Sequence, residues 1–212
     1  MTTNLRIVIF ALMVGALAMP RAQVQAQVQA QAQAESDDAL LRRVEAYLNG
    51  ITTLAANFLQ VNHDGSISEG EIVISRPGRM RIDYAPPLKV EIISDGSWIT
   101  YIDRELGQIS QAPLNGSHAD FLLRKNLSFD KDVVVSAITS QANVIEITFE
   151  RKANPGQGSM TLVFSDNPLE LRQWLVVDAQ RLTTRVTLFD TRFGLDLDPA
   201  LFDAPEPFPS GD

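Results

Sequence analysis

The stretch "GEIVISRPGRMRIDY", residues 70–84, decides how this chain folds. It predicts two β-strands joined by a Pro-Gly turn, because turn residues separate two runs in which apolar and polar side chains alternate. Side chains of a strand alternate between its two faces, so Ile72 and Ile74 share one face with Arg76. The apolar face of the first strand therefore ends in a permanent charge.

Arg76 has two interpretations from the residues alone. In one, the strand bends at Pro77 and the side chain reaches solvent while its stem covers apolar surface. In the other, the guanidinium lies at the edge of an apolar interior, where its hydrogen bonds hold a second element in place. Alternation does not choose between them, because both leave Arg76 at the end of the apolar face.

The same alternation continues through most of the chain. It predicts a mainly β fold of about 11 strands, at residues 54–63, 67–76, 79–85, 88–94, 97–103, 107–112, 131–139, 143–150, 158–165, 169–177 and 182–192. Turn sequences rich in Gly, Pro, Asn and Asp separate them. Strands joined by short turns are antiparallel neighbours, so a meander of this length is expected to curl into a barrel or part of one.

One predicted helix precedes the strands and another interrupts them. Leu41, Val44 and Leu48 are spaced as one apolar stripe of a helix that ends near Gly50. The second helix is predicted within residues 113–126, where a Ser-x-x-Asp sequence offers an N-terminal cap. A helix that interrupts a curled sheet is expected to cover its open side. The sequence therefore predicts a container with a lid, an architecture suited to apolar ligands.

The first 34 residues are expected to direct export. Arg6 precedes an apolar run at residues 7–19, and an Ala/Gln-rich segment with A-x-A-like cleavage sites follows. We therefore divide the chain into residues 1–34, a signal peptide with a low-complexity segment, and residues 35–212, a single domain that functions in the periplasm after cleavage. An uncleaved membrane anchor is the alternative.

Composition narrows the classes of function. Two of the 18 basic residues precede Glu35, so 16 basic and all 26 acidic residues fall in the predicted domain, a net charge of −10. Such a charge disfavours nucleic acid as a partner. The chain has no cysteine, which excludes disulfides, thiol catalysis and lipid attachment through an N-terminal cysteine. We expect a monomer.

No arrangement of residues predicts catalysis or metal binding. The chain lacks a G-x-S-x-G nucleophile motif. Its two histidines, His63 and His118, are far apart in sequence and are predicted to be solvated loop residues. The sequence "GQGSMT" at residues 156–161 lacks the lysine and the helix of a phosphate-binding loop. We therefore expect no catalytic residue, no metal and no cofactor, and a protein that works by binding rather than as an enzyme.

Four segments occur in the order and spacing of one known family: "FLQ" at 58–60, "GEIVISRPGRMRIDYAPP" at 70–87, "SDGSWITYIDRELGQ" at 94–108 and "FLL" at 121–123. Throughout its mature part the chain resembles the periplasmic outer-membrane lipoprotein carrier LolA, and R-P-G-R-x-R-x-x-Y is the most specific segment. The resemblance implies an incomplete, curled antiparallel β-barrel covered by helices, whose apolar interior receives the acyl chains of bacterial lipoproteins. It also implies an inner-membrane ABC transporter of the LolCDE type as donor, and the outer-membrane acceptor LolB or the outer membrane itself as recipient.

The resemblance implies roles for individual residues as well. The arginine of the R-P step, Arg76 here, is the lid latch of the family: it hydrogen-bonds backbone carbonyls of the lid helices and holds the empty carrier closed. The expected contact positions on the lid are Leu48, Leu123 and Arg124. The expected acyl-chain cavity is apolar and is lined by Ile72, Ile74, Met80, Ile82, Tyr84, Phe121 and Leu122.

Two positions depart from the family pattern. His118-Ala119 stands where a Ser/Thr-Pro pair is usual, and Thr100 stands where an aromatic residue is common. Both bear on the shape of the lid and the cavity. Three functions are compatible with the sequence: a lipoprotein carrier, a carrier of free lipid or another hydrophobic ligand on the same scaffold, and a sensor or interaction module whose interior is fully packed.

Overall fold

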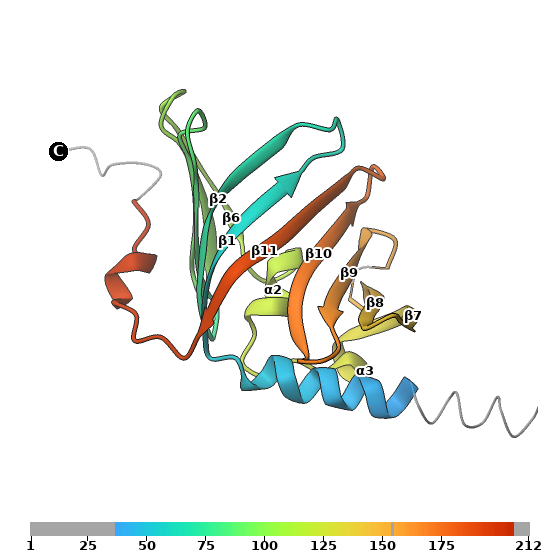
Figure 1. Cartoon of the computed structure of the whole chain (residues 1–212). Helices are drawn as coiled ribbons and strands as arrows, with labels where there is room; N and C mark the ends of the chain where they lie inside the picture. Colours follow the sequence, from blue (N-terminus) through green and yellow to red (C-terminus); the bar gives the residue numbers. More distant parts are fainter. Residues whose placement is uncertain (1–36, 154, 206–212) are drawn as a thin grey trace, which may run out of the picture. The chain divides into compact units, whose positions relative to one another are not determined.

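The computed structural model describes residues 37–153 and 155–205, and the residues from Ala39 onward form one compact unit. The predicted signal peptide lies outside the described residues. The unit is built on one antiparallel sheet that curls around the helix α2 (Figure 1). Its eleven strands are β1 (Thr53–Val61), β2 (Ile67–Ser75), β3 (Arg79–Tyr84), β4 (Val90–Asp95), β5 (Trp98–Asp103), β6 (Gln108–Pro113), β7 (Val133–Gln141), β8 (Val144–Arg151), β9 (Gly158–Ser165), β10 (Glu170–Asp178) and β11 (Thr183–Phe193).

The order of the strands explains why the sheet stays open. It runs β6-β5-β4-β3-β2-β1-β11-β10-β9-β8-β7, so β1 pairs with β11 in the middle and every other neighbour is consecutive in sequence. The two edges are β6 and β7, and the segment between them contains α2 (His118–Leu123) and α3 (Phe129–Asp132). The sheet is therefore a meander that is interrupted before it closes into a barrel. The predicted fold class is confirmed.

The helix at residues 37–50 and the insertion between β6 and β7 are joined to each other. The side chain of Asn49 donates to the carbonyl of Leu127 at 2.9 Å and accepts from its N–H at 2.8 Å. The carboxylate of Glu45 accepts from the N–H of Phe129 at 3.0 Å. We call these two parts, residues 39–50 and 114–132, the lid.

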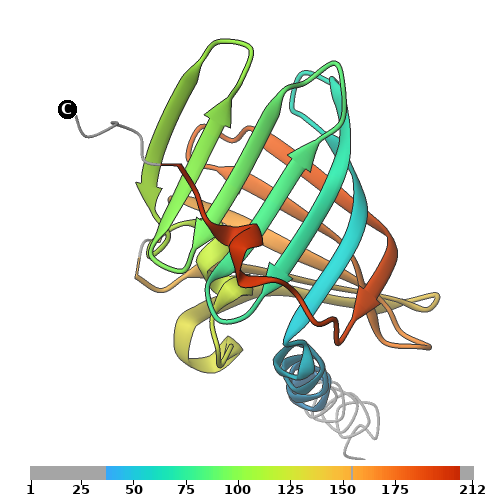
Figure 2. The same cartoon turned by 90° about the vertical axis from the view of Figure 1, so that its left-hand side faces the viewer.

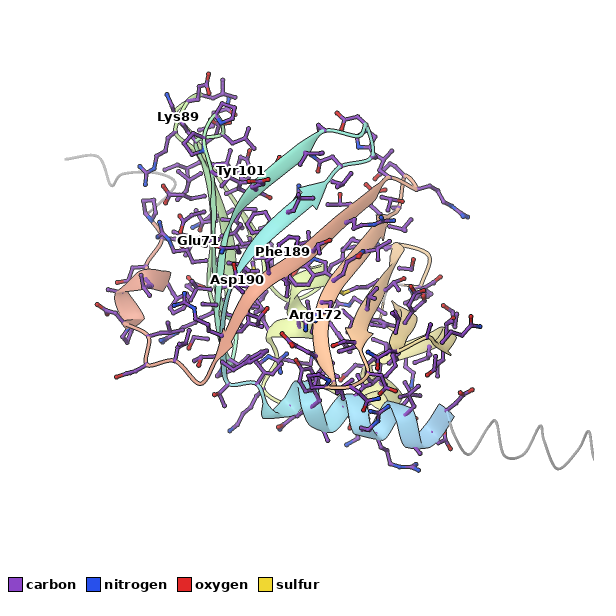
Figure 3. All side chains as sticks on the ribbon, in the orientation of Figure 1. Glu71, Lys89, Tyr101, Arg172, Phe189 and Asp190 are labelled. Atoms are coloured by element: carbon purple, nitrogen blue, oxygen red, sulfur yellow. The ribbon has the colours of Figure 1, made fainter. Side chains whose placement is uncertain are left out.

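The core lies between the lid and the concave face of the sheet. In β8, Ile145, Ile147 and Phe149 are buried while the residues between them are more exposed, which is the alternation that the sequence predicts. Val44 and Leu48, from the predicted apolar stripe, are fully buried. Exposed charged side chains are distributed over the surface (Figure 3). The apolar faces of sheet and helices are thus buried against each other.

The C-terminal segment covers part of the outer face. The 3-10 turn η1 (Pro199–Phe202) begins after Asp198, whose carboxylate accepts from the N–H of Ala200 at 2.9 Å. It lies across β3 and β4 (Figure 2). Phe202 is buried there, although it is not part of the main core on the concave side.

All eleven predicted strands occur, each boundary within two residues of its expected position. The single-turn helix α3 was not predicted, and it delays the start of β7 from residue 131 to Val133. A helix of four residues has too few positions to show a period. Within the part of the chain that the structure describes, no helix is both long enough and apolar enough to cross a membrane.

Candidate functional site

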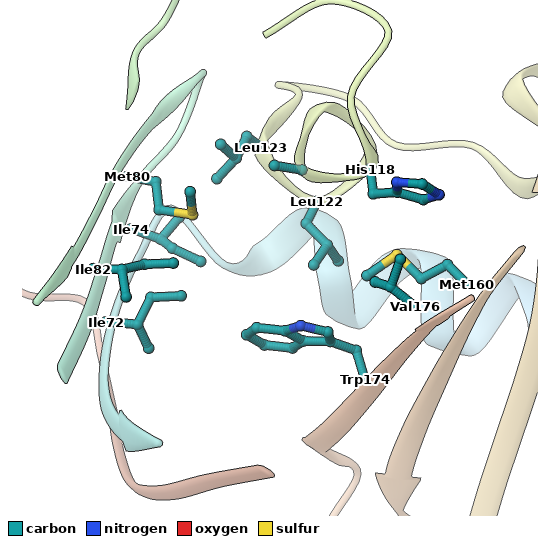
Figure 4. Close-up of a pocket in the computed structure, with 11 residues that line it drawn as sticks. Ile72, Ile74, Met80, Ile82, His118, Leu122, Leu123, Met160, Trp174 and Val176 are labelled. Atoms are coloured by element: carbon teal, nitrogen blue, oxygen red, sulfur yellow. The ribbon is translucent and has the colours of Figure 1, made fainter. Parts of the chain in front are cut away.

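An apolar cavity of about 190 Å³ lies between α2 and the concave face of the sheet (Figure 4). Its lining residues come from two separate parts of the sheet and from the lid: Ile72, Ile74, Met80, Ile82, His118, Ala119, Leu122, Leu123, Met160, Trp174 and Val176. An engineered apolar cavity of about 150 Å³ holds benzene. The cavity therefore accommodates a small apolar group without rearrangement.

Strands β2 and β3 form one wall of the cavity. Ile72 lies opposite Ile82, and Ile74 lies opposite Met80. The four side chains point to the same face because each pair is two residues from the next along its strand. All four belong to the cavity predicted from the sequence.

Strands β9 and β10 form the opposite wall. Met160 lies opposite Val176, and Trp174 follows on the same face of β10. Sequence reasoning did not assign these residues to the cavity. Alternation marked both strands, but it does not indicate that β9 and β10 face β2 and β3 across the curl, because that proximity arises from the pairing of β1 with β11.

Arg76 lies against the C-terminal end of the first lid helix. Its Nη1 donates to the carbonyl of Leu48 at 2.5 Å. Burial lowers the pKa of Arg76 to about 10, so the side chain remains charged at neutral pH. A cation is favourable at the C-terminal end of a helix. Among the described residues, Nε has no hydrogen-bond partner. The side chain therefore faces the lid and not bulk solvent.

Gly78 makes a second contact from the same turn. Its N–H donates to the carbonyl of Leu123, the last residue of α2, at 2.7 Å. Gly78 has a φ of +79°, and a Cβ there would lie 2.6 Å from the Cα of Gly96, so only glycine fits. The hydroxyl of Ser94 donates to the carbonyl of Gly78 at 2.7 Å and holds the turn in place. One β-turn thus binds the C-terminal ends of both longer lid helices.

The three predicted lid contacts therefore have different partners. Leu48 accepts from Arg76, and Leu123 accepts from Gly78. In the described structure Arg124 makes no hydrogen bond with Arg76. Its side chain instead forms ion pairs with Asp120 at 2.8 Å and Asp132 at 2.7 Å within the lid.

The other side of α2 is held by Arg151, at the end of β8. Its Nη1 donates to the carbonyl of Ser117 at 2.6 Å, and its Nη2 pairs with the carboxylate of Asp120 at 3.3 Å. Asp120 also pairs with Arg124, and all three side chains are largely buried. Hydrogen bonds between charged partners are stronger than those between neutral ones. The attachment of α2 to β8 is therefore ionic, whereas its attachment to the β2–β3 turn is a single backbone bond.

Two residues predicted for the cavity lie outside its lining. Tyr84 packs edge-on against Phe58, with ring centroids 5.3 Å apart, and its hydroxyl donates to the side chain of Gln60 at 2.9 Å. Phe121 packs against Phe129 of the lid and Phe149 of β8, with ring centroids 5.6 and 4.5 Å apart. Leu122, the remaining residue predicted for the cavity, does line it, together with Leu123 at the end of α2.

The expectation that His118 is a solvated loop residue is wrong. The residue begins α2, because the Ser117 hydroxyl accepts from the N–H of Asp120 and caps the helix. His118 is half-buried and lines the cavity. Burial, followed by the charge of Arg151, lowers the pKa of His118 below its ordinary 6.5, so it is neutral at neutral pH. No group of three or more acidic or histidine side chains in the described ranges is arranged to hold a metal ion.

Comparison with known proteins gives one consistent family. Residues 49–205 match the family described as Outer membrane lipoprotein carrier protein LolA. An uncharacterised protein of Rickettsia prowazekii is 26% identical over 174 residues, covering 78% of this chain and 80% of that protein. An outer-membrane lipoprotein carrier protein of Methylococcus capsulatus is 27% identical over 173 residues, covering 78% and 83%.

Among solved structures, a LolA superfamily protein of Nitrosomonas europaea is similar with a TM-score of 0.44 and 10% identity, covering 77% of this chain and 97% of that one. The sequence match carries the assignment, since it extends from the end of the first lid helix to the segment after η1. The chain belongs to the LolA family of outer membrane lipoprotein carrier proteins.

Proposed function

We propose that this protein is a periplasmic carrier that binds the acyl chains of lipoproteins released by an inner-membrane ABC transporter of the LolCDE type. It then takes them to the outer membrane, directly or through an acceptor of the LolB type. Family membership and the names of relatives support this proposal. The observation that carries it is one β-turn, with donors from Arg76 and Gly78, that binds both longer lid helices over an apolar cavity.

The chemistry of the cargo explains why the cavity needs a lid. Burying one methylene group from water is worth about 0.8 kcal/mol, so a lipoprotein with long acyl chains does not leave a bilayer unaided. A carrier must offer those chains an apolar surface of matching size. Such a surface, when empty and exposed, promotes aggregation. A lid that closes over the empty cavity meets both requirements.

The size of the cavity supports the proposal that the lid is closed in the described structure. At about 190 Å³ it is smaller than the roughly 300–1,000 Å³ of pockets that enclose drug-sized ligands. Several long acyl chains are much larger than such a volume allows. Loading therefore requires the lid to move away from the sheet.

The contacts of α2 indicate which side opens. On the β8 side, Arg151 binds Asp120 and the carbonyl of Ser117 through charged hydrogen bonds. On the β2–β3 side, one neutral bond from Gly78 holds α2, and Arg76 holds the first lid helix. Because the neutral bond is weaker than the charged ones, we infer that α2 separates from the β2–β3 turn more readily than from β8.

The carrier works by binding and not by catalysis. The chain lacks a phosphate-binding loop, so the free energy for extracting cargo from the inner membrane is supplied by the transporter. The closed state then favours release, because lid closure and acyl binding compete for the same apolar surface.

Depletion of the protein in cells tests this function. Lipoproteins destined for the outer membrane should accumulate at the inner membrane. Mass spectrometry of the protein purified from periplasm should detect bound acylated protein. Free lipid in its place would support the carrier of hydrophobic ligands. An interior that binds neither cargo nor an apolar fluorescent probe would contradict the proposal and support a sensor or interaction module.

A further inference from the structure

We propose that Glu45 and Asn49 couple the two parts of the lid, so that both swing away from the β2–β3 turn as one flap that stays attached to β8, β9 and β10. This inference rests on the proposed carrier function, because it concerns how the same lid opens. The lid makes three groups of contacts: those between its two parts, those with β8, β9 and β10, and those with the β2–β3 turn. These groups differ in number and in burial, and the opening movement follows from the difference.

The two parts of the lid are joined by side chains that bind backbone groups. The amide of Asn49 both donates to the carbonyl of Leu127 at 2.9 Å and accepts from its N–H at 2.8 Å. The carboxylate of Glu45 accepts from the N–H of Phe129 at 3.0 Å. Leu127 and Phe129 are buried. Separating the two parts would therefore break three hydrogen bonds and expose two large apolar side chains.

The first part of the lid is anchored on β9 and β10, whose connecting turn lies beside the first helix (Figure 1). The ring of Tyr47 packs edge-on against Phe164 of β9, with centroids 6.1 Å apart. Its hydroxyl accepts from the N–H of Leu171 of β10 at 3.0 Å. An ion pair between Arg43 and Asp166 at 2.7 Å lies nearer the surface and adds less. The anchor is therefore mainly the buried side of Tyr47.

Both parts are thus held on the same side of the sheet. Arg151 attaches α2 to β8, which neighbours β9 and, through it, β10. At the β2–β3 turn, the described residues make one hydrogen bond to each part, from Arg76 to Leu48 and from Gly78 to Leu123. The lid is therefore expected to open at the turn. Because its parts are joined, releasing either of these two bonds weakens the hold on both parts.

Hydrogen exchange at single amides, measured by NMR on the purified protein without cargo, tests the movement. The N–H of Gly78 reports on the β2–β3 turn, those of Leu127 and Phe129 on the joint between the parts, and that of Leu171 on the anchor. We expect Gly78 to be protected about tenfold less than the other three, because its exchange requires fewer broken contacts. Exchange at Leu127 or Leu171 as fast as at Gly78 would overturn the single flap.

The coupling itself is tested with Arg76→Leu, since Arg76 binds the first part and Gly78 the second. Arg76→Leu should speed exchange at Gly78 about tenfold, as expected for one charged hydrogen bond. In a protein that carries both Glu45→Ala and Asn49→Ala, the same substitution should change this exchange by less than about twofold. In a protein that carries Asn57→Ala, at an exposed position of β1, the tenfold effect should persist.

Two results would overturn the coupling. One is an equal effect of Arg76→Leu with and without the changes at Glu45 and Asn49, which would show that it acts on Gly78 directly through the turn. The other is no effect of Arg76→Leu on Gly78 in the otherwise unmodified protein. The comparison of amides in the unmodified protein needs no substitution, so it is decisive even where a variant fails to fold. None of these measurements uses cargo. A lid that opens as one flap in a protein that transfers no lipoprotein would therefore refute the carrier function and leave this inference standing.

Discussion

Replacing Arg76 by leucine should leave the fold intact and slow the release of cargo. The substitution removes the hydrogen bond from the guanidinium to the carbonyl of Leu48, which links the first lid helix to β2. It does not affect the sheet ladder, because the backbone N–H of Arg76 still donates to the carbonyl of Thr52. The closed, empty state is weakened relative to the loaded state, so the carrier should hold its cargo longer.

Two opposing effects determine how much Arg76→Leu shifts the balance between the closed and the loaded state. A hydrogen bond from a charged group contributes about 1.5–3 kcal/mol. The cost of removing the guanidinium from water reduces this contribution, as the fall of the Arg76 pKa to about 10 indicates. In addition, Nε has no hydrogen-bond partner within the described residues. We therefore expect the lower end of the range, about 1.5 kcal/mol, or roughly a tenfold shift toward the loaded state. Leucine at the rim also offers apolar contact to acyl chains, which acts in the same direction.

The assay compares transfer of a labelled lipoprotein from purified carrier to acceptor membranes. Arg76→Leu should transfer about tenfold less at early times, with an unchanged circular dichroism spectrum. Arg79→Leu is the matched control, since Arg79 belongs to the same hairpin but is exposed. If Arg76→Leu transfers lipoprotein as fast as the unmodified protein and Arg79→Leu does too, the latch reasoning is refuted.

Three further predictions follow from the same contacts. Gly78→Ala should reduce the free energy of unfolding, measured in urea, by about 1–3 kcal/mol, and by more than Gly107→Ala does. Both glycines have positive φ, but only at Gly78 would the added Cβ collide with backbone atoms, those of Gly96. Equal losses in the two variants would contradict the close packing of Gly78 against Gly96. Asp120→Asn should weaken the attachment of α2 to β8 by about 1–3 kcal/mol and speed hydrogen exchange in residues 118–123. Asp130→Asn, at an exposed position of α3, should not change this exchange. Unchanged exchange in Asp120→Asn would show that the ion pairs contribute little. Because the pKa of His118 is lowered in the folded protein, the unfolded state binds the proton more readily, so stability should be lost as the pH falls below about 6.5. That loss should become smaller in His118→Gln but not in His63→Gln, and an identical pH dependence in both variants would remove His118 as its source.

Local pattern predicted the elements of this fold well. Alternation of side chains and the residues of the turns located every strand to within two residues, because each strand of a meander carries its own period and its own turns. The apolar stripe of the first helix and the cap of α2 were equally readable. The four-residue helix α3 was missed, since its length shows no period.

For the candidate site, the sequence predicted one part, and the other part became visible only in the folded structure. The sequence by itself determined one wall of the cavity, because Ile72, Ile74, Met80 and Ile82 lie on two adjacent strands whose register follows from the turn between them. It also marked Arg76 as a charge at the end of an apolar face. Tertiary structure alone decided the opposite wall, where Met160, Trp174 and Val176 approach only because β1 pairs with β11 and curls the sheet.

The lid, too, was predicted from the sequence only in part. Sequence indicated an inserted helix, but only the tertiary structure placed His118 on the cavity and Phe121 away from it, since which face of a short helix is inward depends on what holds its ends. Here those ends are fixed by Arg151 and Gly78, residues 34 and 45 positions away from Ser117 and Leu123. Contacts between distant residues carry no local period, so they become visible only when the chain is folded.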